Sequence, residues 1–308
     1  MTPLTVFVFY LYSPLIPARG DSMNIAIIGL GEVGRCYAAP LIQAGHEVSL
    51  CEAHVSPAAA TLASKAGLEI HDRPGAWLAE IDFVLSCVTG TTSLPVLRDV
   101  LPHVRPGTTI ADFTTASPSV KREGAALAFT AGVAYVDTAI MGAISLNLVR
   151  TPLLASGAGA KQLKAMLENA GGRVQVIAEG KAGDAISLKI LRSVFTKGME
   201  ALCVELLMSA EKQGVRAELY EQLSDIDQTP LRSFMDMLVR THVLHAKRRA
   251  HEVHDAQNEL ISQGLESVVL PGVERRFADT AQALDRKALP SPDPTVDQAV
   301  EWLLASRC

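Results

Sequence analysis

The sequence predicts an N-terminal α/β domain with a doubly wound parallel sheet, followed by an all-helical C-terminal domain. Short Val/Ile-rich runs alternate with Ala/Leu-rich helical segments up to about residue 177, and no strand pattern occurs from residue 184 onward. Apolar runs without alternation are typical of parallel strands that are covered on both faces. The length of 308 residues is also about twice that of a usual single domain. We expect an extension outside the fold over residues 1–22, an α/β domain over 23–182 and a helical domain over 183–308.

Seven apolar runs of the α/β domain are predicted strands. They are Asn24–Ile28, Glu47–Cys51, Asp82–Cys87, Thr108–Phe113, Ala134–Thr138, Leu153–Ser156 and Arg173–Ile177. The segments between them are predicted helices, among them Val33–Ala44, Pro57–Ala66 and Lys161–Asn169. This alternation of strands and helices predicts crossover connections between parallel strands.

The helical domain is predicted to begin with one long helix, with Asp184 as its N-cap and Gly214 as its stop. Prolines then separate the later helices. These are 217–224, Leu231–Gln263 (in which a break stays open), Gly272–Arg286 and Thr295–Ser306.

Composition excludes several classes of partner. The net charge of −5 and the pI of about 5.9 argue against nucleic acid and anionic membranes, which both bind positive surfaces. The apolar run within residues 6–11 is too short to span a bilayer. A signal peptide is the alternative interpretation of residues 1–22, although no Lys or Arg precedes this run. We therefore expect no nucleic-acid partner and no membrane partner.

Cysteine and histidine usage predicts a cytoplasmic protein without a metal. The five cysteines are scattered and form no CxxC pair, which fits a reducing compartment and no disulfide framework. The pairs His242/His245 and His251/His254 would point in nearly opposite directions on a continuous helix. One ion would not reach all four, so no metal is predicted.

A glycine motif follows the first predicted strand and opens the first helix. Residues 24–34 read N-I-A-I-I-G-L-G-E-V-G. In this Rossmann-type motif the first glycine allows a tight turn, the second admits a pyrophosphate and the third packs the helix on the strand. The predicted cofactor-binding residues of the motif are Gly29, Leu30, Gly31, Glu32, Val33 and Gly34.

Glu52 directly follows the second predicted strand, 18 positions beyond Gly34. A carboxylate at this point accepts the hydroxyls of a ribose and repels a 2′-phosphate. The predicted cofactor is therefore NAD, and Arg73 is near enough in sequence to keep NADP as a second option.

The motif and four later segments resemble the β-hydroxyacid dehydrogenase family, which includes 6-phosphogluconate and 3-hydroxyisobutyrate dehydrogenases. The later segments are residues 82–89, 112–118, 137–143 and 180–189. The resemblance implies that Val88, Thr89, Thr115 and His251 contact the cofactor. It also implies that Thr115, Met141, Gly142, Ala143, Arg192 and Ser193 bind substrate, and that Lys189 is the catalytic residue. A homodimer through the helical domain is a further implication.

Three departures indicate a divergent, phosphogluconate-dehydrogenase-like branch of this family. Met141-Gly-Ala stands where the family has Ser-Gly-Gly, and Arg192-Ser193 stands where it has two asparagines. The family's later Lys-Asp-Leu segment reads His251-Glu-Val. The resemblance is therefore a better guide to the fold and cofactor of this chain than to its substrate.

Lys189 is the predicted general acid/base. Oxidation of an alcohol requires a base near the hydroxyl, and an ordinary lysine is too basic unless burial or nearby cations lower its pKa. Arg192, Ser193 and Lys197 share the predicted helix face of Lys189. We expect the two cations among them, Arg192 and Lys197, to lower the pKa of Lys189. A plain solvated helix face is the alternative.

The predicted function is an NAD(P)-dependent oxidoreductase acting on a small 3-hydroxy acid or related anion. The substrate is expected between the nicotinamide and Lys189 in a cleft between the domains. The alternatives are an imine reductase-like enzyme, which the loss of the serine at Met141 favours, and a non-catalytic NAD-binding regulator.

Overall fold

A computed structural model describes residues 22–306, which form two compact units that meet between Ser193 and Val194. Each unit is described by itself. The predicted extension over residues 1–22 lies outside the described residues except for Ser22. The division between units falls inside helix α7 (Asp184–Gln213), and the predicted domain boundary at residue 183 stays a prediction.

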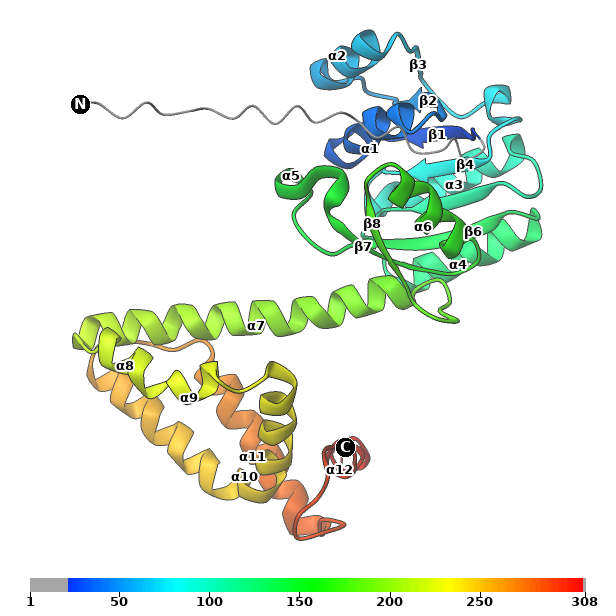
Figure 1. Ribbon diagram of the computed structural model, residues 1–308. Helices are drawn as coiled ribbons and strands as arrows, with labels where there is room; N and C mark the ends of the chain where they lie inside the picture. Colours follow the sequence, from blue (N-terminus) through cyan, green and yellow to red (C-terminus); the bar gives the residue numbers. More distant parts are fainter. Residues whose placement is uncertain (1–21, 307–308) are drawn as a thin grey trace, which may run out of the picture. The chain divides into compact units, whose positions relative to one another are not determined.

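The first unit is an α/β unit built on one eight-stranded sheet (Figure 1). Its elements are β1 (Asn24–Ile28), α1 (Glu32–Gln43), β2 (Glu47–Cys51), α2 (Pro57–Ala66), β3 (Ile70–His71), β4 (Phe83–Ser86), α3 (Ser93–Val100), β5 (Thr109–Asp112), α4 (Pro118–Thr130), β6 (Ala134–Ile140), α5 (Ile144–Asn147), β7 (Pro152–Ser156), α6 (Ala160–Asn169) and β8 (Arg173–Val176). The strand order is β3-β2-β1-β4-β5-β6-β7-β8. All neighbouring pairs are parallel except β6 and β7, which are antiparallel.

The predicted fold class is confirmed, and the bounds of β1, β2 and α2 are those that the sequence predicts. The prediction missed β3, because a two-residue strand is too short to leave a recognisable pattern. It also gave no direction for β7, whose antiparallel pairing is set by the short connection from β6 rather than by a pattern in β7 itself.

Apolar side chains cover both faces of this sheet. On one face α1, α2 and α6 contribute Tyr37, Ala63 and Leu163 to a core that also contains strand residues. On the other face α3 and α4 contribute Leu97 and Ala128 to a second core. Burial on both faces explains the continuous apolar runs of the parallel strands.

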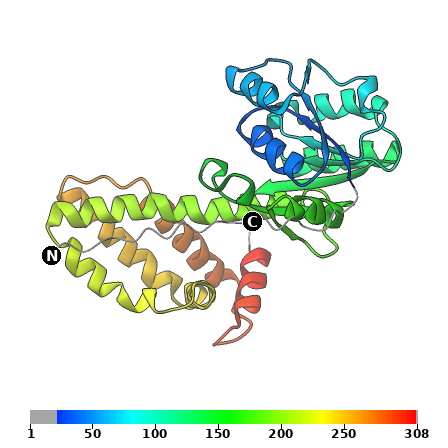
Figure 2. The same ribbon diagram turned by 45° about the horizontal axis from the view of Figure 1, so that its top comes forward.

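The second unit is helical (Figure 2). From Val194 on it contains the rest of α7, then α8 (Arg216–Gln222), α9 (Ser224–Asp227), α10 (Leu231–Ser262), α11 (Leu270–Arg286) and α12 (Val296–Ala305). The break that stayed open within residues 231–263 does not occur, since α10 is continuous. A small core of Val243, Ala283, Ala299 and Trp302 joins α10, α11 and α12.

Helix α12 begins with a reciprocal cap. The Thr295 hydroxyl accepts from the Gln298 backbone N–H at 3.2 Å, and the Gln298 side chain accepts from the Thr295 N–H at 2.9 Å. Such a capping box satisfies two N–H groups that a helix start leaves free. None of the helices within residues 22–306 has the length and apolar character needed to cross a membrane.

Replacement of Leu163 by Ala is expected to destabilise the α/β unit by about 2–5 kcal/mol, because the side chain is fully buried and a cavity remains. The matched control is Phe129→Ala on α4, since Phe129 is 84% exposed and surface substitutions change stability by about 0.5 kcal/mol or less. Urea unfolding followed by circular dichroism measures both. Equal losses in the two variants would contradict the assigned core.

Candidate active site

The predicted site residues of the α/β unit follow strands that end at the same edge of the sheet. The strand registers align Ile28 with Ser86, Ser86 with Asp112, and Asp112 with Asp137 across β1, β4, β5 and β6. The loops after β1, β4 and β5 therefore leave the sheet side by side at its carboxyl edge, where ligands of open α/β sheets bind, whereas β6 continues beyond Asp137 to Ile140 before its loop begins. The first three loops carry the glycine motif, Val88 and Thr89, and Thr115, and the loop after β6 carries Met141 to Ala143.

The three glycines of the motif meet different demands. Gly29 has a φ of +92° and a Cβ there would lie 2.8 Å from the backbone of Cys87. A Cβ at Gly34 would lie 2.0 Å from the Gly29 carbonyl oxygen. No atom lies within 4 Å of the place where Gly31 would carry a Cβ. The fold requires the first and third glycines, whereas the second leaves open space in front of its backbone.

A cavity of about 570 Å³ borders this loop. The predicted cofactor residues that line it are Gly29, Gly31, Glu52, Val88 and Thr89, and Arg73 lines it as well. The volume is that of a small-molecule site, and the loop precedes the N-terminus of α1, where free N–H groups favour a phosphate. These features fit a dinucleotide.

The carboxylate of Glu52 is held at the side of this cavity by two backbone groups. Leu30 donates its N–H to Oε2 at 2.7 Å, and His54 donates its N–H to Oε1 at 3.0 Å. Leu30 is buried, and Glu32 and Val33 begin α1. Because each carboxylate oxygen has further acceptor capacity, Glu52 remains able to accept from a ribose hydroxyl.

Two neighbouring strand residues hold the first turn of α7. Asp137 on β6 accepts from the backbone N–H groups of Gly183 and Ile186 through Oδ2, at 3.1 and 3.0 Å. Ser156, its partner on β7, accepts from the Ala185 N–H at 3.1 Å. These bonds satisfy three donors that the helix start leaves free. The prediction of Asp184 as N-cap is wrong, since Asp184 lies within the helix and accepts from the Lys181 N–H.

Lys189 lies in the second turn of α7 and is half-buried. Burial lowers the pKa of its ammonium group below the ordinary value, the nearby cation Lys121 lowers it further, and Asp137 acts in the opposite direction. Helical side chains point back toward the helix N-terminus. This direction carries Lys189 toward Asp137, which caps that end.

The expectation that Arg192 lowers the pKa of Lys189 is wrong. The guanidinium of Arg192 donates instead to the Met141 carbonyl oxygen at 2.7 Å. The cation that acts on Lys189 is Lys121 on α4, which the sequence prediction missed.

Lys121 is fully buried, with a relative exposure of 0%. Its Nζ donates to the Asp112 carbonyl oxygen at 2.7 Å and lies 3.0 Å from Asp112 Oδ1 and 3.4 Å from Asp137 Oδ1. The sequence contains one signal for this face of α4, because the small residues Gly124 and Ala128 follow Lys121 by three and seven positions, which is the spacing of one helix face. The structure shows that both are buried.

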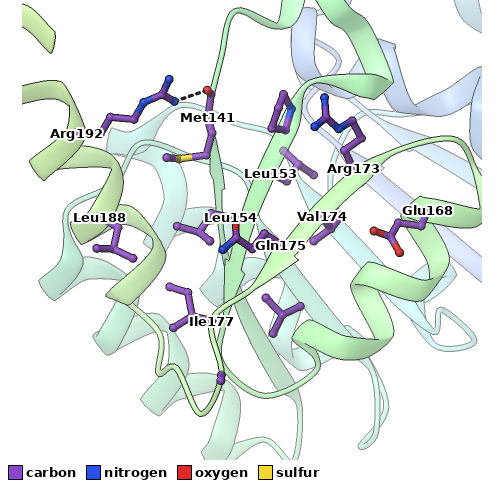
Figure 3. A pocket seen from close by; sticks show the side chains of 13 residues that line it. Met141, Leu153, Leu154, Glu168, Arg173, Val174, Gln175, Ile177, Leu188 and Arg192 are labelled. Atoms are coloured by element: carbon purple, nitrogen blue, oxygen red, sulfur yellow. Dashed lines mark hydrogen bonds between the residues drawn. The ribbon is translucent and has the colours of Figure 1, made fainter. Parts of the chain in front are cut away.

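Met141 and Arg192 line a second cavity of about 820 Å³ that the cofactor-side residues do not share (Figure 3). Leu188 of α7, Glu168 of α6, residues of β7 and β8 and the two residues after β8 also line it. Leu154 and Ile177 give it an apolar wall. Met141, on the loop after β6, and Arg192 of α7 are joined by their hydrogen bond.

The other predicted residues lie at the surface. Thr115, Gly142 and Ala143 are exposed directly after β5 and β6, Ser193 is half-buried on α7, and His251 is exposed on α10 of the helical unit. Among residues 22–306, no three His, Cys, Asp or Glu side chains are arranged to hold a metal ion.

Comparison with known proteins identifies the family. Residues 24–178 match the family described as the NAD binding domain of 6-phosphogluconate dehydrogenase, and residues 210–280 match a domain of unknown function, DUF1932. Since the first match covers half of the chain, the chain belongs to the family that this NAD-binding domain defines. The resemblance found in the motifs is thereby confirmed, together with NAD as cofactor and the oxidoreductase class.

Individual relatives agree with this assignment. An uncharacterized 28.5 kDa protein of Methanothermus fervidus is 29% identical over 258 residues, which cover 83% of this chain and 98% of that protein. A probable 3-hydroxyisobutyrate dehydrogenase of Mycobacterium tuberculosis is 29% identical over 199 residues, covering 63% of this chain and 66% of that protein. The solved imine reductase of Myxococcus stipitatus with NAD⁺ has the same fold, with a TM-score of 0.73 at 17% identity over 92% of this chain and all of that one.

Substitution of Gly31 by Ala is expected to raise the NADH dissociation constant at least about tenfold while leaving the thermal midpoint unchanged. The methyl group meets no protein atom, but it enters the space through which a pyrophosphate approaches the backbone. Fluorescence titration measures NADH affinity. The control is Gly272→Ala on α11, which also has open space around it and should bind NADH normally. Unchanged NADH affinity in Gly31→Ala would contradict the assigned cofactor loop.

Proposed function

We propose that the protein is an NAD-dependent dehydrogenase that oxidises the alcohol carbon of a small 3-hydroxy acid or related anion, with Lys189 as general acid/base. The observation that carries the proposal is the half-buried Lys189 with its lowered pKa, on a helix anchored by Asp137 at the sheet edge that bears the glycine loop. A pKa nearer to neutrality suits a group that must both accept and return a proton.

The bound dinucleotide would supply a nicotinamide ring that takes up a hydride. Gly31 and the start of α1 would hold its pyrophosphate, and Glu52 would accept from its adenosine ribose. Val88 and Thr89 would contact the cofactor further along the same cavity. Thr115, which follows β5 at this edge, would lie beside the nicotinamide.

Neutral Lys189 would take the proton of the substrate hydroxyl while the carbon loses its hydride, and the ammonium form would return that proton in the reverse direction. We assign Arg192 and Ser193 to the anionic group of the substrate, since both follow Lys189 on α7. Met141, Gly142 and Ala143, on the loop after β6, would form the wall beside Arg192. The methionine offers no hydroxyl to a carboxylate, so Arg192 would provide the main charged contact.

NAD is the preferred cofactor in this proposal. The carboxylate of Glu52 would repel a 2′-phosphate, whereas Arg73, which lines the same cavity, is the one feature that favours NADP. Tighter binding of NADPH than of NADH in the titration described above would contradict the preference.

Lys189→Ala is expected to lower kcat by a factor of about 10² or more with little change in NADH affinity. Oxidation needs neutral Lys189, so kcat/KM for oxidation should rise with pH and level off above the pKa of this group, which lies below its ordinary value. The profile for reduction should fall over the same range, because reduction needs the ammonium form. A cofactor-reduction assay over a panel of hydroxy acids, hydroxy amino acids and imines measures these rates.

Lys161→Ala is the matched control, since Lys161 is an exposed lysine on α6 and its loss should leave turnover unchanged. Full turnover in Lys189→Ala would contradict the acid/base role. Absence of turnover with every compound of the panel would favour a non-catalytic NAD-binding regulator.

Imine reduction is the second candidate, and Met141 is the observation that favours it. The loss of a hydroxyl at this position makes the pocket less suited to a carboxylate. The same assay separates the two, because an imine reductase would turn over the imines of the panel faster than the hydroxy acids.

We further infer that the protein forms a homodimer through α7 and acts in the reducing cytoplasm. Leu191, Val194, Val204 and Met208 on this helix are each more than half exposed in the single chain, and apolar surface of this extent is typical of an interface. A second copy is the partner that the family resemblance implies. The free cysteines Cys36, Cys51, Cys87 and Cys203 fit a reducing compartment.

Light scattering after size exclusion should give twice the chain mass of 32.8 kDa. Met208→Glu should shift the protein toward the monomer, because a charge buried in an interface is costly. Phe129→Glu on α4 is the control at an exposed apolar residue outside α7. A monomeric wild-type protein would contradict the inference.

A further inference from the structure

Lys121 is a buried cation for which the proposed reaction has no direct use. It emerges from α4, it is completely enclosed, and its ammonium group contacts carboxylates on two adjacent strands. A buried ion pair of this kind contributes little net stability, since desolvation offsets most of its attraction. Stability alone is therefore a weak explanation for it.

The two carboxylates of this cluster are not equivalent. Burial tends to raise the pKa of Asp112, but Lys121 and hydrogen bonds from Tyr135 and Ser93 outweigh this and leave the pKa below its ordinary value. The Tyr135 hydroxyl donates to Asp112 Oδ2 at 2.6 Å, and the Ser93 hydroxyl donates to the same oxygen at 2.7 Å. Asp112 is thus an anion in direct contact with Lys121.

Asp137 is less well supplied with donors. Burial raises its pKa, and the attraction of Lys121 offsets this only in part. Its Oδ2 is occupied by the first turn of α7, whereas its Oδ1 accepts no hydrogen bond within residues 22–306 and lies 3.4 Å from Lys121 Nζ. The side chain that anchors the helix of Lys189 is therefore in direct contact with Lys121.

We propose that Lys121 is a positioning residue that sets the charge state of Lys189 through space, with Asp137 as the opposing charge between the two lysines. The proposal rests on the acid/base role of Lys189. The positive charge of Lys121 disfavours protonation of Lys189, and the negative charge of Asp137 favours it. The balance of these two charges decides which fraction of Lys189 is neutral. In a low-dielectric interior, where water does not screen it, a nearby charge shifts the pKa of a neighbouring ionisable group.

The other charged groups around the start of α7 have different partners or positions. Arg192 donates to the Met141 carbonyl oxygen, and the Asp184 carboxylate accepts from the Lys181 N–H. Arg122, which is exposed on α4, approaches Gly183 with its guanidinium. Of these groups, Lys121 and Asp137 are the two whose charges act on the pKa of Lys189.

The test measures the pKa of Lys189 directly, without any substrate. The full-length protein is acylated with trace acetic anhydride between pH 6 and pH 11, and mass spectrometry follows the modification of the peptide that contains Lys189. Because only the neutral amine reacts, the midpoint of the curve is the pKa. Lys121→Met should raise the midpoint by about one unit and Asp137→Asn should lower it. The asparagine keeps a side-chain oxygen for the N–H groups of Gly183 and Ile186.

The double variant Lys121→Met/Asp137→Asn provides the decisive comparison. It removes both opposing charges, so its midpoint should lie between those of the single variants, and it keeps the proposal testable should Lys121→Met alone not fold. Lys161→Met changes the same net charge at an exposed site and should leave the midpoint unchanged. Midpoints equal to wild type in all folded variants would overturn the proposal and assign Lys121 a structural role only.

This readout is independent of the proposed reaction. If the midpoints shift as expected while Lys189→Ala keeps full turnover, the electrostatic coupling holds and the acid/base role fails. If the assay detects turnover, kcat/KM for oxidation by Lys121→Met should fall about tenfold near neutral pH and recover at high pH. A uniform loss at every pH would indicate a structural role and contradict the coupling.

Discussion

Lys121 brings a positive charge into the interior of the α/β unit, and the geometry around the candidate site is organised to accommodate it. The ammonium group is tolerated because Asp112, at the end of β5, and its register partner Asp137, within β6, both present their carboxylates to it. Asp137 also accepts two N–H groups from the start of α7. One side chain thus joins the charge cluster, the sheet edge and the helix that carries Lys189. The direction of α7 at its origin follows from that single carboxylate and its neighbour Ser156.

The glycine loop and the buried charges make different contributions to the candidate site. The glycine loop determines the shape of the cofactor cavity. Gly29 and Gly34 are required because other backbone atoms lie close to them, and Gly31 leaves space for a ligand. The cluster behind the sheet edge provides an electric field, because its charges are buried where water does not screen them. The acid/base role proposed for Lys189 needs both, since a lowered pKa serves this reaction only next to a bound cofactor. The family assignment agrees with the first part, and the second part comes from the side chains of Lys121, Asp112 and Asp137.

The sequence was sufficient for the architecture and for the cofactor side of the site. Continuous apolar runs fixed the longer strands, and the spacing of Gly29, Gly31 and Glu52 selected residues that line one cavity. It was insufficient where tertiary contacts override local pattern. Lys121 stands in the first turns of a helix among polar residues, where a lysine is ordinarily solvated, and only Gly124 and Ala128 mark its face as buried. Arg192 shares a helix face with Lys189 on a helical wheel, yet its long side chain bonds to the backbone of Met141 instead.

Gly31 differs from its neighbours in the motif because the folded chain places no restriction on it. Serine or aspartate would cap α1 at least as well, and the absence of any atom within 4 Å means that a larger residue would fit. A lineage that had abandoned its nucleotide could therefore fill this position by ordinary genetic drift without losing the fold. The folded chain alone gives no reason for glycine at this position, and the open space in front of its backbone lies where the pyrophosphate of a dinucleotide would approach.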